Sequence, residues 1–486
     1  MRFSTQFRHL NVAPAFQWVA LVSSIFVVTF SAQAEVTLPS LVGNGMVLQR
    51  DQPITVWGWA EAKEKVALTF NGKTFATQAG ADQKWQVKLP STPAGGPYTM
   101  VVKGRNTITL QDILVGDVWV CSGQSNMQFQ MKTVQDRYRQ EIASSANPQI
   151  RHFLVKHALA YSPARDVESA GWQEANPETV LGFTAVGYFF ARELFEKYKV
   201  PIGLLHTSNG GTPAEAWMSA DALQEFPEYQ ALIPKSAPAG PLKENGEKKK
   251  PSVLYNGMVA PLLPYTIKGV IWYQGEANAN AGKGKEYAQL FPALIKDWRS
   301  HWGQKDFPFL FVQLANYALP KAKPGDDSWA LLREAQSQTL SLPNTGMAVT
   351  HDIGEANDIH PRNKKEVGHR LALLAQNLVY GNTEVVASGP TLKAVKQDGK
   401  KMVLSFEHTG SGLVAKGGGE LNQFMVAGAS GTFVAATAHI KGDQVEVWSD
   451  RVPQPVAVRY AWANNPEGAN LYNKEGLPAS SFRTDR

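Results

Sequence analysis

The sequence has very little cysteine and no large excess of charge of either sign. Cys121 is the only cysteine in 486 residues, which excludes an intramolecular disulfide and a thiolate zinc site. The 48 basic and 42 acidic residues are spread along the chain, and this diffuse charge does not indicate a nucleic-acid partner. Glycine and proline show no period, which excludes collagen-like and low-complexity chains. With 43% hydrophobic and 19% charged residues, the composition is that of a globular protein. The length of 486 residues indicates about three domains, or one large domain with appendages.

The first 34 residues have the pattern of an export signal. Arg2 and Arg8 precede an apolar run over Val19–Phe30, and Ala32-Gln33-Ala34 follows as a small-x-small cleavage site. The run is shorter than the roughly 20 residues that a spanning helix needs. We therefore predict a signal peptide over residues 1–34 and an exported, periplasmic rather than secreted, protein without stable membrane insertion after cleavage. An uncleaved N-terminal anchor is the alternative.

Residues 35–112 have the pattern of a small β domain. Val66, Leu68 and Phe70 alternate with smaller or polar neighbours, and Asn71-Gly72 separates them from a second run. Asn-Gly between two such runs predicts a hairpin, because both turn positions need positive φ. A sandwich-like β domain is the expected architecture.

Residues 113–382 alternate between short apolar runs and segments of helical period. The alternation predicts a mostly parallel sheet with helices on both faces, an α/β domain. The predicted strands are Val118–Cys121, His152–Val155, Ile202–His206, Val270–Tyr273, Phe309–Val312 and Met347–Thr350, and the clearest helices are Ala185–Tyr198, Tyr287–Trp298 and Lys364–Leu378.

Two further segments interrupt or follow this pattern. Residues 234–251 are rich in Pro and Gly and contain Lys248-Lys249-Lys250, which is typical of a solvated loop. Period-two segments return in residues 383–486, for example at Met402–Phe406 and Thr432–Ala436, and predict a C-terminal β-rich region.

Four unusual motifs follow predicted strands of the α/β domain. They are Gly123-Gln124-Ser125-Asn126-Met127, Asn209-Gly210-Gly211-Thr212, Gln274-Gly275-Glu276 and Asp358-Ile359-His360-Pro361. In an open parallel sheet, ligands bind outside the carboxyl ends of the strands, where the connecting loops converge. We therefore expect the four motifs to share one cleft.

Ser125 is the candidate nucleophile of this cleft, because Gly123 permits a sharp strand-to-helix turn before it. The alternative is a serine that only caps a helix. A serine nucleophile needs a base. Among the histidines, His360 is the one in a loop after a strand and before a helix, whereas His351 and His369 are expected to be structural. A metal cluster of His351, Asp352, His360 and His369 lacks tight ligand spacing, so we expect no metal and no cofactor.

Acyl transfer also needs hydrogen-bond donors directed at the developing oxyanion. Gly211 can offer an unobstructed backbone amide, Gln274 a side-chain amide, and Ser125 its own amide. Each glycine or glutamine alone has a plainer explanation as a turn or surface residue. Together with Ser125 and His360 at one sheet edge they favour a serine hydrolase.

The four motifs resemble those of the SGNH-hydrolase superfamily, and within it they are most similar to the bacterial sialate O-acetylesterases and related carbohydrate acetylesterases. Flanking segments resemble the same family, namely Met46-Val47-Leu48-Gln49-Arg50 and 460–466. The resemblance implies a flavodoxin-like three-layer domain with attached β domains, and metal-independent removal of O-acetyl groups from sugars, 9-O-acetylated sialic acids above all.

The resemblance also implies roles for single residues. Ser125 matches the nucleophile, His360 the general base, and Gly211 and Gln274 the second and third oxyanion donors. The superfamily places the triad Asp three residues before the histidine, but Asn357 stands there and Asp358 lies two before. We assign Asp358 as the residue that orients the imidazole; the alternatives are an acid elsewhere in the chain, or a backbone carbonyl, which leaves a Ser-His dyad.

Three matters stay open at this stage. Glu276 can order Gln274, bind a substrate hydroxyl, or serve as a structural carboxylate. A xylan or other polysaccharide acetylesterase has the same chemistry on a different sugar, and a non-catalytic carbohydrate-binding protein is the alternative from another class, since 13 tryptophans could stack on sugars. An acetylated carbohydrate is the expected partner, and the oligomeric state cannot be inferred.

Overall fold

The computed structural model describes residues 35–233, 244–318 and 327–485. The predicted signal peptide, residues 1–34, and the first part of the predicted loop, residues 234–243, lie outside the described residues. Within the described ranges, no helix is both long and apolar enough to cross a membrane.

The N-terminal region is built of short β-strands, as its period of two predicts. Lys65–Phe70 and Lys73–Gln78 pair antiparallel as β3 and β4. Asn71 and Gly72 join them with φ of 47° and 72°, so the predicted hairpin is confirmed. The other strands here are β1 (Val47–Gln49), β2 (Ile54–Trp59), β5 (Lys84–Leu89) and β6 (Gly95–Lys103).

One long strand, β7 (Thr107–Gly123), connects this region to the α/β region. Its first half pairs with β6, and its second half lies at the centre of the parallel sheet. Asp112 within it has a φ of 59°. The predicted division after residue 112 therefore lies inside a strand that both sheets share.

The central sheet is parallel except for one edge strand. Its order is β13-β12-β11-β7-β10-β8-β9, and β9 pairs antiparallel with β8. The strands are β8 (Asn147–Leu154), β9 (Trp172–Ala175), β10 (Ile202–Ser208), β11 (Gly269–Tyr273), β12 (Phe309–Val312) and β13 (Thr345–Ala348). All six predicted strands are present: β12 has the predicted bounds, β7 begins 11 residues before its predicted start, and the ends of the other four differ by at most five residues.

The strand order differs from the flavodoxin-like order 2-1-3-4-5 that the resemblance implies. Counted from β7, the third parallel strand, β10, lies between the first, β7, and the second, β8. Sequence patterns do not reveal such an exchange, because every interior parallel strand is apolar on both faces.

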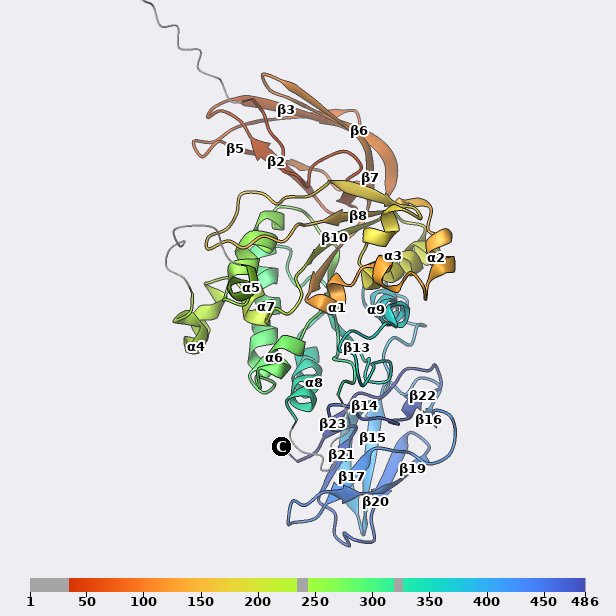
Figure 1. The fold of residues 1–486 in the computed structure, drawn as a ribbon. Coiled ribbons are helices and arrows are strands. Elements are labelled where there is room, and N and C mark those ends of the chain that lie inside the picture. The colour runs from red at the N-terminus through yellow and green to blue at the C-terminus, as the bar shows by residue number, and fades with distance from the viewer. Residues whose placement is uncertain (1–34, 234–243, 319–326, 486) are drawn as a thin grey trace, which may run out of the picture. The chain divides into compact units, whose positions relative to one another are not determined.

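Helices cover both faces of the central sheet (Figure 1). On one face, α3 (Ala185–Tyr198) and α9 (Lys364–Leu378) pack over Cys121 and Ile271 in one hydrophobic core. On the other, α7 (Tyr287–Trp302) and α8 (Ser328–Gln338) share a second core with Trp272. The alternation of side chains along each strand supplies both cores, so the predicted layering is confirmed.

The remaining helical segments are short. They are α1 (Ser125–Gln128), α2 (Arg139–Ala143), α4 (Pro227–Gln230), α5 (Glu244–Glu247), α6 (Glu276–Asn280), η1 (Met131–Val134), η2 (Thr179–Gly182), η3 (Ala214–Trp217), η4 (Ala222–Glu225), η5 (Tyr255–Val259), η6 (Ala260–Leu262) and η7 (Thr339–Ser341).

The C-terminal region is β-rich, as predicted. It contains β14 (Thr391–Asp398), β15 (Lys401–Glu407), β16 (Leu413–Ala415), β17 (Phe424–Ala427), β18 (Val434–Ala435), β19 (Thr437–Lys441), β20 (Gln444–Trp448), β21 (Ala457–Tyr460), β22 (Leu471–Asn473) and β23 (Phe482–Arg483). They form sheets of four, four and two strands around a core of their own. The predicted strand over Thr432–Ala436 is reduced to the two residues of β18.

Candidate active site

Three neighbouring strands end level with one another, and polar motifs follow each of them. In the parallel register, Gly123 at the end of β7 pairs with Ser208 of β10 and with Tyr273 of β11. The segments that begin at Gln124, Asn209 and Gln274 therefore leave the sheet at the same edge. This is the convergence that the motif positions predict.

Gly123 makes the turn into Ser125. Its φ is 129°, and a Cβ added to it would lie 2.2 Å from the carbonyl oxygen of Tyr273. Only glycine fits both the conformation and the space. Ser125 is the first residue of α1, and the position before the helix is taken by Gln124, so Ser125 is not a helix cap.

The side chains of Ser125 and His360 are hydrogen bonded. The distance from Ser125 Oγ to His360 Nε2 is 2.8 Å, although 235 residues separate the two along the chain. His360 lies in the loop between β13 and α9, as its position in the sequence predicts. A hydroxyl at this distance can pass its proton to a neutral imidazole.

Asp358 lies beside His360 but is not in hydrogen-bond contact with the ring. Its Oδ1 accepts a hydrogen bond from the backbone N–H of His360 at 2.8 Å and is 3.6 Å from Nδ1. Both side chains are partly exposed. The carboxylate thus fixes the loop directly and acts on the imidazole mainly through its charge.

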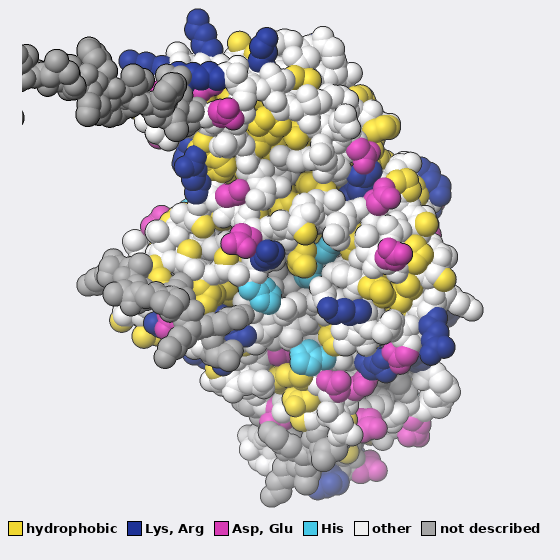
Figure 2. Space-filling model, turned by 45° about the horizontal axis from the view of Figure 1, so that its top comes forward, with side chains coloured by type: hydrophobic (Ala, Val, Ile, Leu, Met, Phe, Trp, Pro, Cys, Tyr) yellow, Lys and Arg dark blue, Asp and Glu magenta, His cyan; other side chains and the backbone are white. Residues whose placement is uncertain are grey.

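A cavity of about 550 Å³ opens over this pair. Phe129 lies on its wall with its ring stacked on that of His360, 6.2 Å between centroids. Histidine side chains gather in the middle of the face that Figure 2 shows. The cavity is lined by Ser125, Gln128, Phe129, Gln130, Thr133, Leu154, Val155, Lys156, His157, His206, Ser208 and His360.

The environment of His360 favours the neutral imidazole that a base requires. Burial and, next, the charge of Lys364 lower the pKa of His360 below its ordinary value, while the charge of Asp358 acts in the opposite direction. The imidazole therefore stays neutral to lower pH than an unperturbed histidine does.

Asn126, the residue after Ser125, is buried at the centre of a polar network. Its Nδ2 donates to Glu276 Oε1 at 2.5 Å and to the carbonyl of Ile359 at 3.0 Å, and its Oδ1 accepts from Lys364 Nζ at 2.5 Å. Glu276 is 2% exposed and is absent from the cavity wall. The geometry favours a Glu276 carboxylate that orders another residue of the site. The residue that it orders is Asn126 and not Gln274.

The Gly-Gly motif after β10 lies against the nucleophile. A Cβ on Gly210 would be 3.2 Å from Cβ of Ser125, and its N–H donates to Gln128 Oε1 at 2.8 Å. Gly211 follows with a φ of 72°, and nothing lies within 4 Å of the position that a Cβ would take there. The motif thus provides a side-chain-free approach next to Ser125.

The Gln274 side chain is held in the interior in this structure. Its side chain is fully buried, and Nε2 donates to Asn278 Oδ1 at 2.7 Å and to the carbonyl of Thr212 at 3.2 Å. Its Oε1 accepts from the hydroxyl of Tyr287 at 2.7 Å. A primary amide has two hydrogens, and in this arrangement internal acceptors hold both, so the oxyanion role of Gln274 stays a prediction that requires its amide to turn toward the cleft.

Several residues of the cleft were not found from the sequence. Gln128 Nε2 donates to His157 Nε2 at 3.1 Å on the wall, and Ser208 Oγ is 2.7 Å from His206 Nε2 at the base. His206 in turn contacts His152 at 3.2 Å. Burial, with a smaller contribution from the charge of His157, lowers the pKa of His206 to about 3. The sequence signal that could have identified His206 and Ser208 is the segment His206-Thr207-Ser208 at the end of a predicted strand.

The histidines set aside in the sequence are bonded elsewhere. His351 Nε2 is 2.7 Å from the carbonyl of Ala479, and His369 Nδ1 is 2.8 Å from Glu193 Oε2. Asp352 pairs with Arg370. In the described part of the chain, no group of three or more His, Cys, Asp or Glu side chains is arranged to hold a metal ion.

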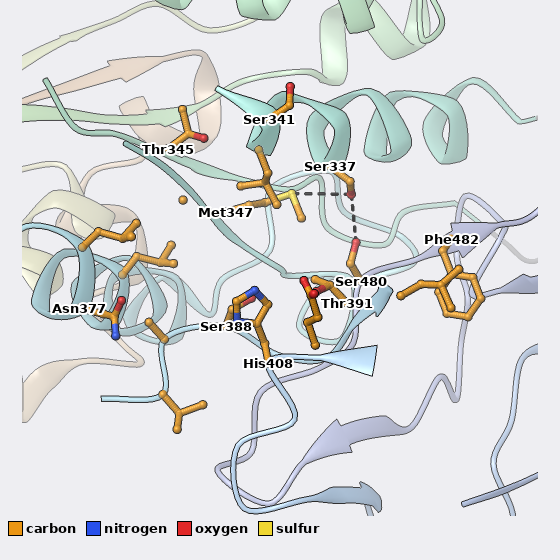
Figure 3. A pocket seen from close by; sticks show the side chains of 18 of the residues that line it. Ser337, Ser341, Thr345, Met347, Asn377, Ser388, Thr391, His408, Ser480 and Phe482 are labelled. Carbon is orange, nitrogen blue, oxygen red and sulfur yellow. Dashed lines mark hydrogen bonds between the residues drawn. The ribbon is translucent and has the colours of Figure 1, made fainter. Parts of the chain in front are cut away.

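A second, larger cavity of about 890 Å³ lies between α8, β13 and the C-terminal strands (Figure 3). Its wall includes Ser337, Met347 and Ser480, whose polar atoms contact one another: Ser337 Oγ is 3.1 Å from Ser480 Oγ and 3.9 Å from Met347 Sδ. Neither Ser125 nor His360 lines this cavity. The smaller cavity is therefore the candidate active site.

Comparison with known proteins agrees with this geometry. Residues 115–377 match the model of a family described as carbohydrate esterase, sialic acid-specific acetylesterase. The human sialate O-acetylesterase is 33% identical over 408 residues, with 76% of each chain covered, and the mouse sialate O-acetylesterase is 30% identical over 450 residues, covering 80% and 81%.

A solved structure supports the same assignment. The carbohydrate acetylesterase from Xanthomonas citri is 45% identical, and its structure superimposes with a TM-score of 0.86 over 93% of this chain and all of that one. An enzyme of this kind is a carboxylic ester hydrolase. The family match and the relatives together show that the chain belongs to the sialic acid-specific acetylesterase family of carbohydrate esterases.

Proposed function

We propose that this esterase removes O-acetyl groups from sugars through an acyl-enzyme on Ser125, with His360 as the general base. The hydrogen bond of 2.8 Å between Ser125 Oγ and His360 Nε2 at the floor of an open cleft carries this proposal. A carbohydrate-binding protein without activity has no need of a nucleophile and a base in contact.

The reaction proceeds in two halves. His360 takes the proton of Ser125 while Oγ attacks the acetyl carbonyl, and His360 then gives that proton to the departing sugar oxygen, which leaves as a hydroxyl as its bond to the acetyl carbon breaks. Water attacks the acyl-enzyme by the same route, which releases acetate and restores Ser125. The amides of Ser125 and Gly211 stabilise the oxyanion, and Asp358 favours the imidazolium that forms in each half.

We propose 9-O-acetylated sialic acids as the substrates, because the curated relatives carry the name sialate O-acetylesterase. Acetylated xylan or another polysaccharide is the second candidate. The structural neighbour from Xanthomonas citri is named only a carbohydrate acetylesterase, which leaves that sugar open.

The proposal is tested by acetate release from 9-O-acetylated sialic acid and from acetylated xylan, side by side, after hydrolysis of p-nitrophenyl acetate has been measured. A kcat/KM at least tenfold higher on the sialic acid supports the substrate assignment. The reverse ranking overturns it in favour of a polysaccharide. Absence of p-nitrophenyl acetate hydrolysis by the folded protein contradicts the proposed mechanism itself.

The sequence motifs further support an SGNH-type catalytic domain, and the N-terminal pattern supports export to the periplasm. N-terminal sequencing of the exported protein tests the second point. We expect it to begin near Glu35, and a mature protein that begins at Met1 contradicts cleavage.

A further inference from the structure

Lys364 is a fully buried lysine that contacts Asn126, the residue after the nucleophile. It is the first residue of α9, four positions after His360, and its side chain has no exposed surface. Its Nζ lies 4.6 Å from the ring centroid of Phe129 and 5.5 Å from that of Tyr273. Burying an ammonium group is costly unless the charge is well paired. A lysine at such a position therefore calls for an explanation that core packing does not give.

The contacts of Lys364 lead to both reacting side chains. Its ammonium donates to Asn126 Oδ1, and Asn126 follows Ser125 in the chain. The other end of the Asn126 amide donates to Glu276 in α6 and to the carbonyl of Ile359, the residue before His360. One amide thus joins the segment that carries the serine to the loop that carries the histidine, and Lys364 holds the oxygen of that amide.

We propose, on the basis of the proposed function, that Lys364 is a positioning residue for the esterase reaction. It fixes the Asn126 amide, and this amide holds Ser125 Oγ and His360 Nε2 at hydrogen-bond distance from each other. Glu276 is the buried counter-charge of the same device. Its Oε1 bonds Asn126, and its Oε2 has no hydrogen-bond partner among the described residues. Lys364 and Glu276 therefore bond the oxygen and the nitrogen, respectively, of the same Asn126 amide.

The charge of Lys364 adds an effect that a purely structural side chain would lack. His360 lies between this ammonium, which favours the neutral imidazole, and Asp358, which favours the protonated one. Burial lowers the pKa of Lys364 to about 7, although the carboxylates of Glu276, Asp358 and Glu355 oppose this effect, so Lys364 carries its charge over the acid limb of the profile. Removing the ammonium leaves burial alone to oppose Asp358, so His360 then holds its proton to higher pH than in the wild type.

The test compares Lys364→Met with Lys365→Met in the full chain. Lys365 is the next residue, is exposed, and bonds Glu141 at the surface, so K365M removes the same charge without touching the network. For each variant kcat, KM and the pH profile of kcat/KM are measured with p-nitrophenyl acetate, and thermal unfolding reports the fold.

We expect K364M to lower kcat by about 100-fold, as displacement of reacting groups by about 1 Å does, while KM stays within about threefold. The acid limb of its profile should move to higher pH, and K365M should match the wild type in both respects. A folded K364M with wild-type kcat and an unmoved acid limb overturns the proposal.

Asn126→Ala keeps the test decisive if K364M does not fold. This variant removes the link but leaves the ammonium, so kcat should fall by a similar factor while the acid limb stays in place. The double variant K364M/N126A should be no slower than the slower single variant, because both act through one amide. A folded N126A with wild-type kcat, or effects of the two substitutions that multiply, overturns the proposal.

Labelling of Ser125 by diisopropyl fluorophosphate separates this inference from the proposed function. Oγ forms a bond to phosphorus, fluoride leaves, and His360 accepts the serine proton, so the rate reports the Ser125–His360 pair without a sugar or acetyl substrate. An unlabelled wild type contradicts the proposed function. A labelled wild type with slow labelling of K364M and N126A supports the positioning role, and equal rates in all three refute it.

Discussion

Asp358 Oδ1 is 2.8 Å from the backbone nitrogen of His360 and 3.6 Å from Nδ1 of its ring. The two-residue spacing brings the carboxylate to the correct side of the loop, but its closest bond is to the main chain. In this arrangement the main effect of the carboxylate is to fix the loop conformation, and its effect on the protonation of the imidazole is smaller.

Asp358→Asn should therefore reduce kcat only modestly. A half-exposed charge pair is worth about 1 kcal/mol or less, which corresponds to a factor of about five in rate. Steady-state kinetics on p-nitrophenyl acetate measure this, with Asn357→Ala as the matched control that should retain full activity. A loss of about 10⁴-fold in D358N would instead assign it the full role of a triad acid, and a loss confined to N357A would exclude Asp358.

Ser125→Ala should abolish turnover and spare the fold. The side chain is small and partly exposed, and its one described side-chain bond is to His360, so its removal disturbs little packing. We expect hydrolysis at background level and a Tm within a few degrees of the wild type. Retention of measurable multiple-turnover activity would show that another group is the nucleophile.

Local patterns predicted the elements that position this site. The helices over Ala185–Tyr198 and Lys364–Leu378 and the strand over Phe309–Val312 have the predicted bounds, because buried faces of fixed period leave a direct signal in the sequence. The meeting of Ser125 and His360 followed from one rule, the convergence of loops at the carboxyl edge of a parallel sheet.

Side-chain direction within the site could not be predicted in the same way. Gln274 and Ser125 both follow strands that end level, yet the amide of Gln274 points into the interior, where Asn278 and Tyr287 hold it. The sequence shows Lys364 only as the start of a helix, because nothing local indicates that a lysine in the first helical turn is buried. The burial of Lys364 depends on Asn126, 238 residues away, whereas Asn278 and Tyr287 are only 4 and 13 residues from Gln274 and meet its amide through the way α6 and α7 pack.

The activity of the enzyme should fall on the acid side with a midpoint below 6.5, the ordinary pKa of histidine. Burial and the Lys364 charge lower the pKa of His360, so the neutral base is present above that lowered value and is lost as the pH falls through it. The pH profile of kcat/KM between 4 and 8 tests this. A flat profile between pH 5 and 8 would still allow a midpoint below 5, but a midpoint above 6.5 contradicts the electrostatics.

Gly123→Ala should destabilise the protein more than an ordinary glycine substitution. An alanine at positive φ costs roughly 1–2 kcal/mol, and at Gly123 its Cβ would also lie 2.2 Å from the Tyr273 carbonyl oxygen. Gly303→Ala is the matched control, because Gly303 has a φ of 64° with open space around it. Urea unfolding should show a clearly larger loss for G123A, and equal losses would mean that the backbone can shift there.

Gln274→Ala distinguishes an internal amide from an oxyanion donor. In the observed geometry the substitution leaves the hydroxyl of buried Tyr287 with only the backbone carbonyl of residue 274, at 3.5 Å, as acceptor, and it opens a small cavity, so the free energy of unfolding should fall by about 1–3 kcal/mol. The kcat should change less than the 100-fold or more that follows removal of an oxyanion donor. Gln289→Ala, at an exposed position of α7, should change neither quantity. Unchanged stability with a 100-fold loss of kcat would return Gln274 to the oxyanion hole, and it would mean that the amide turns toward the cleft when substrate binds.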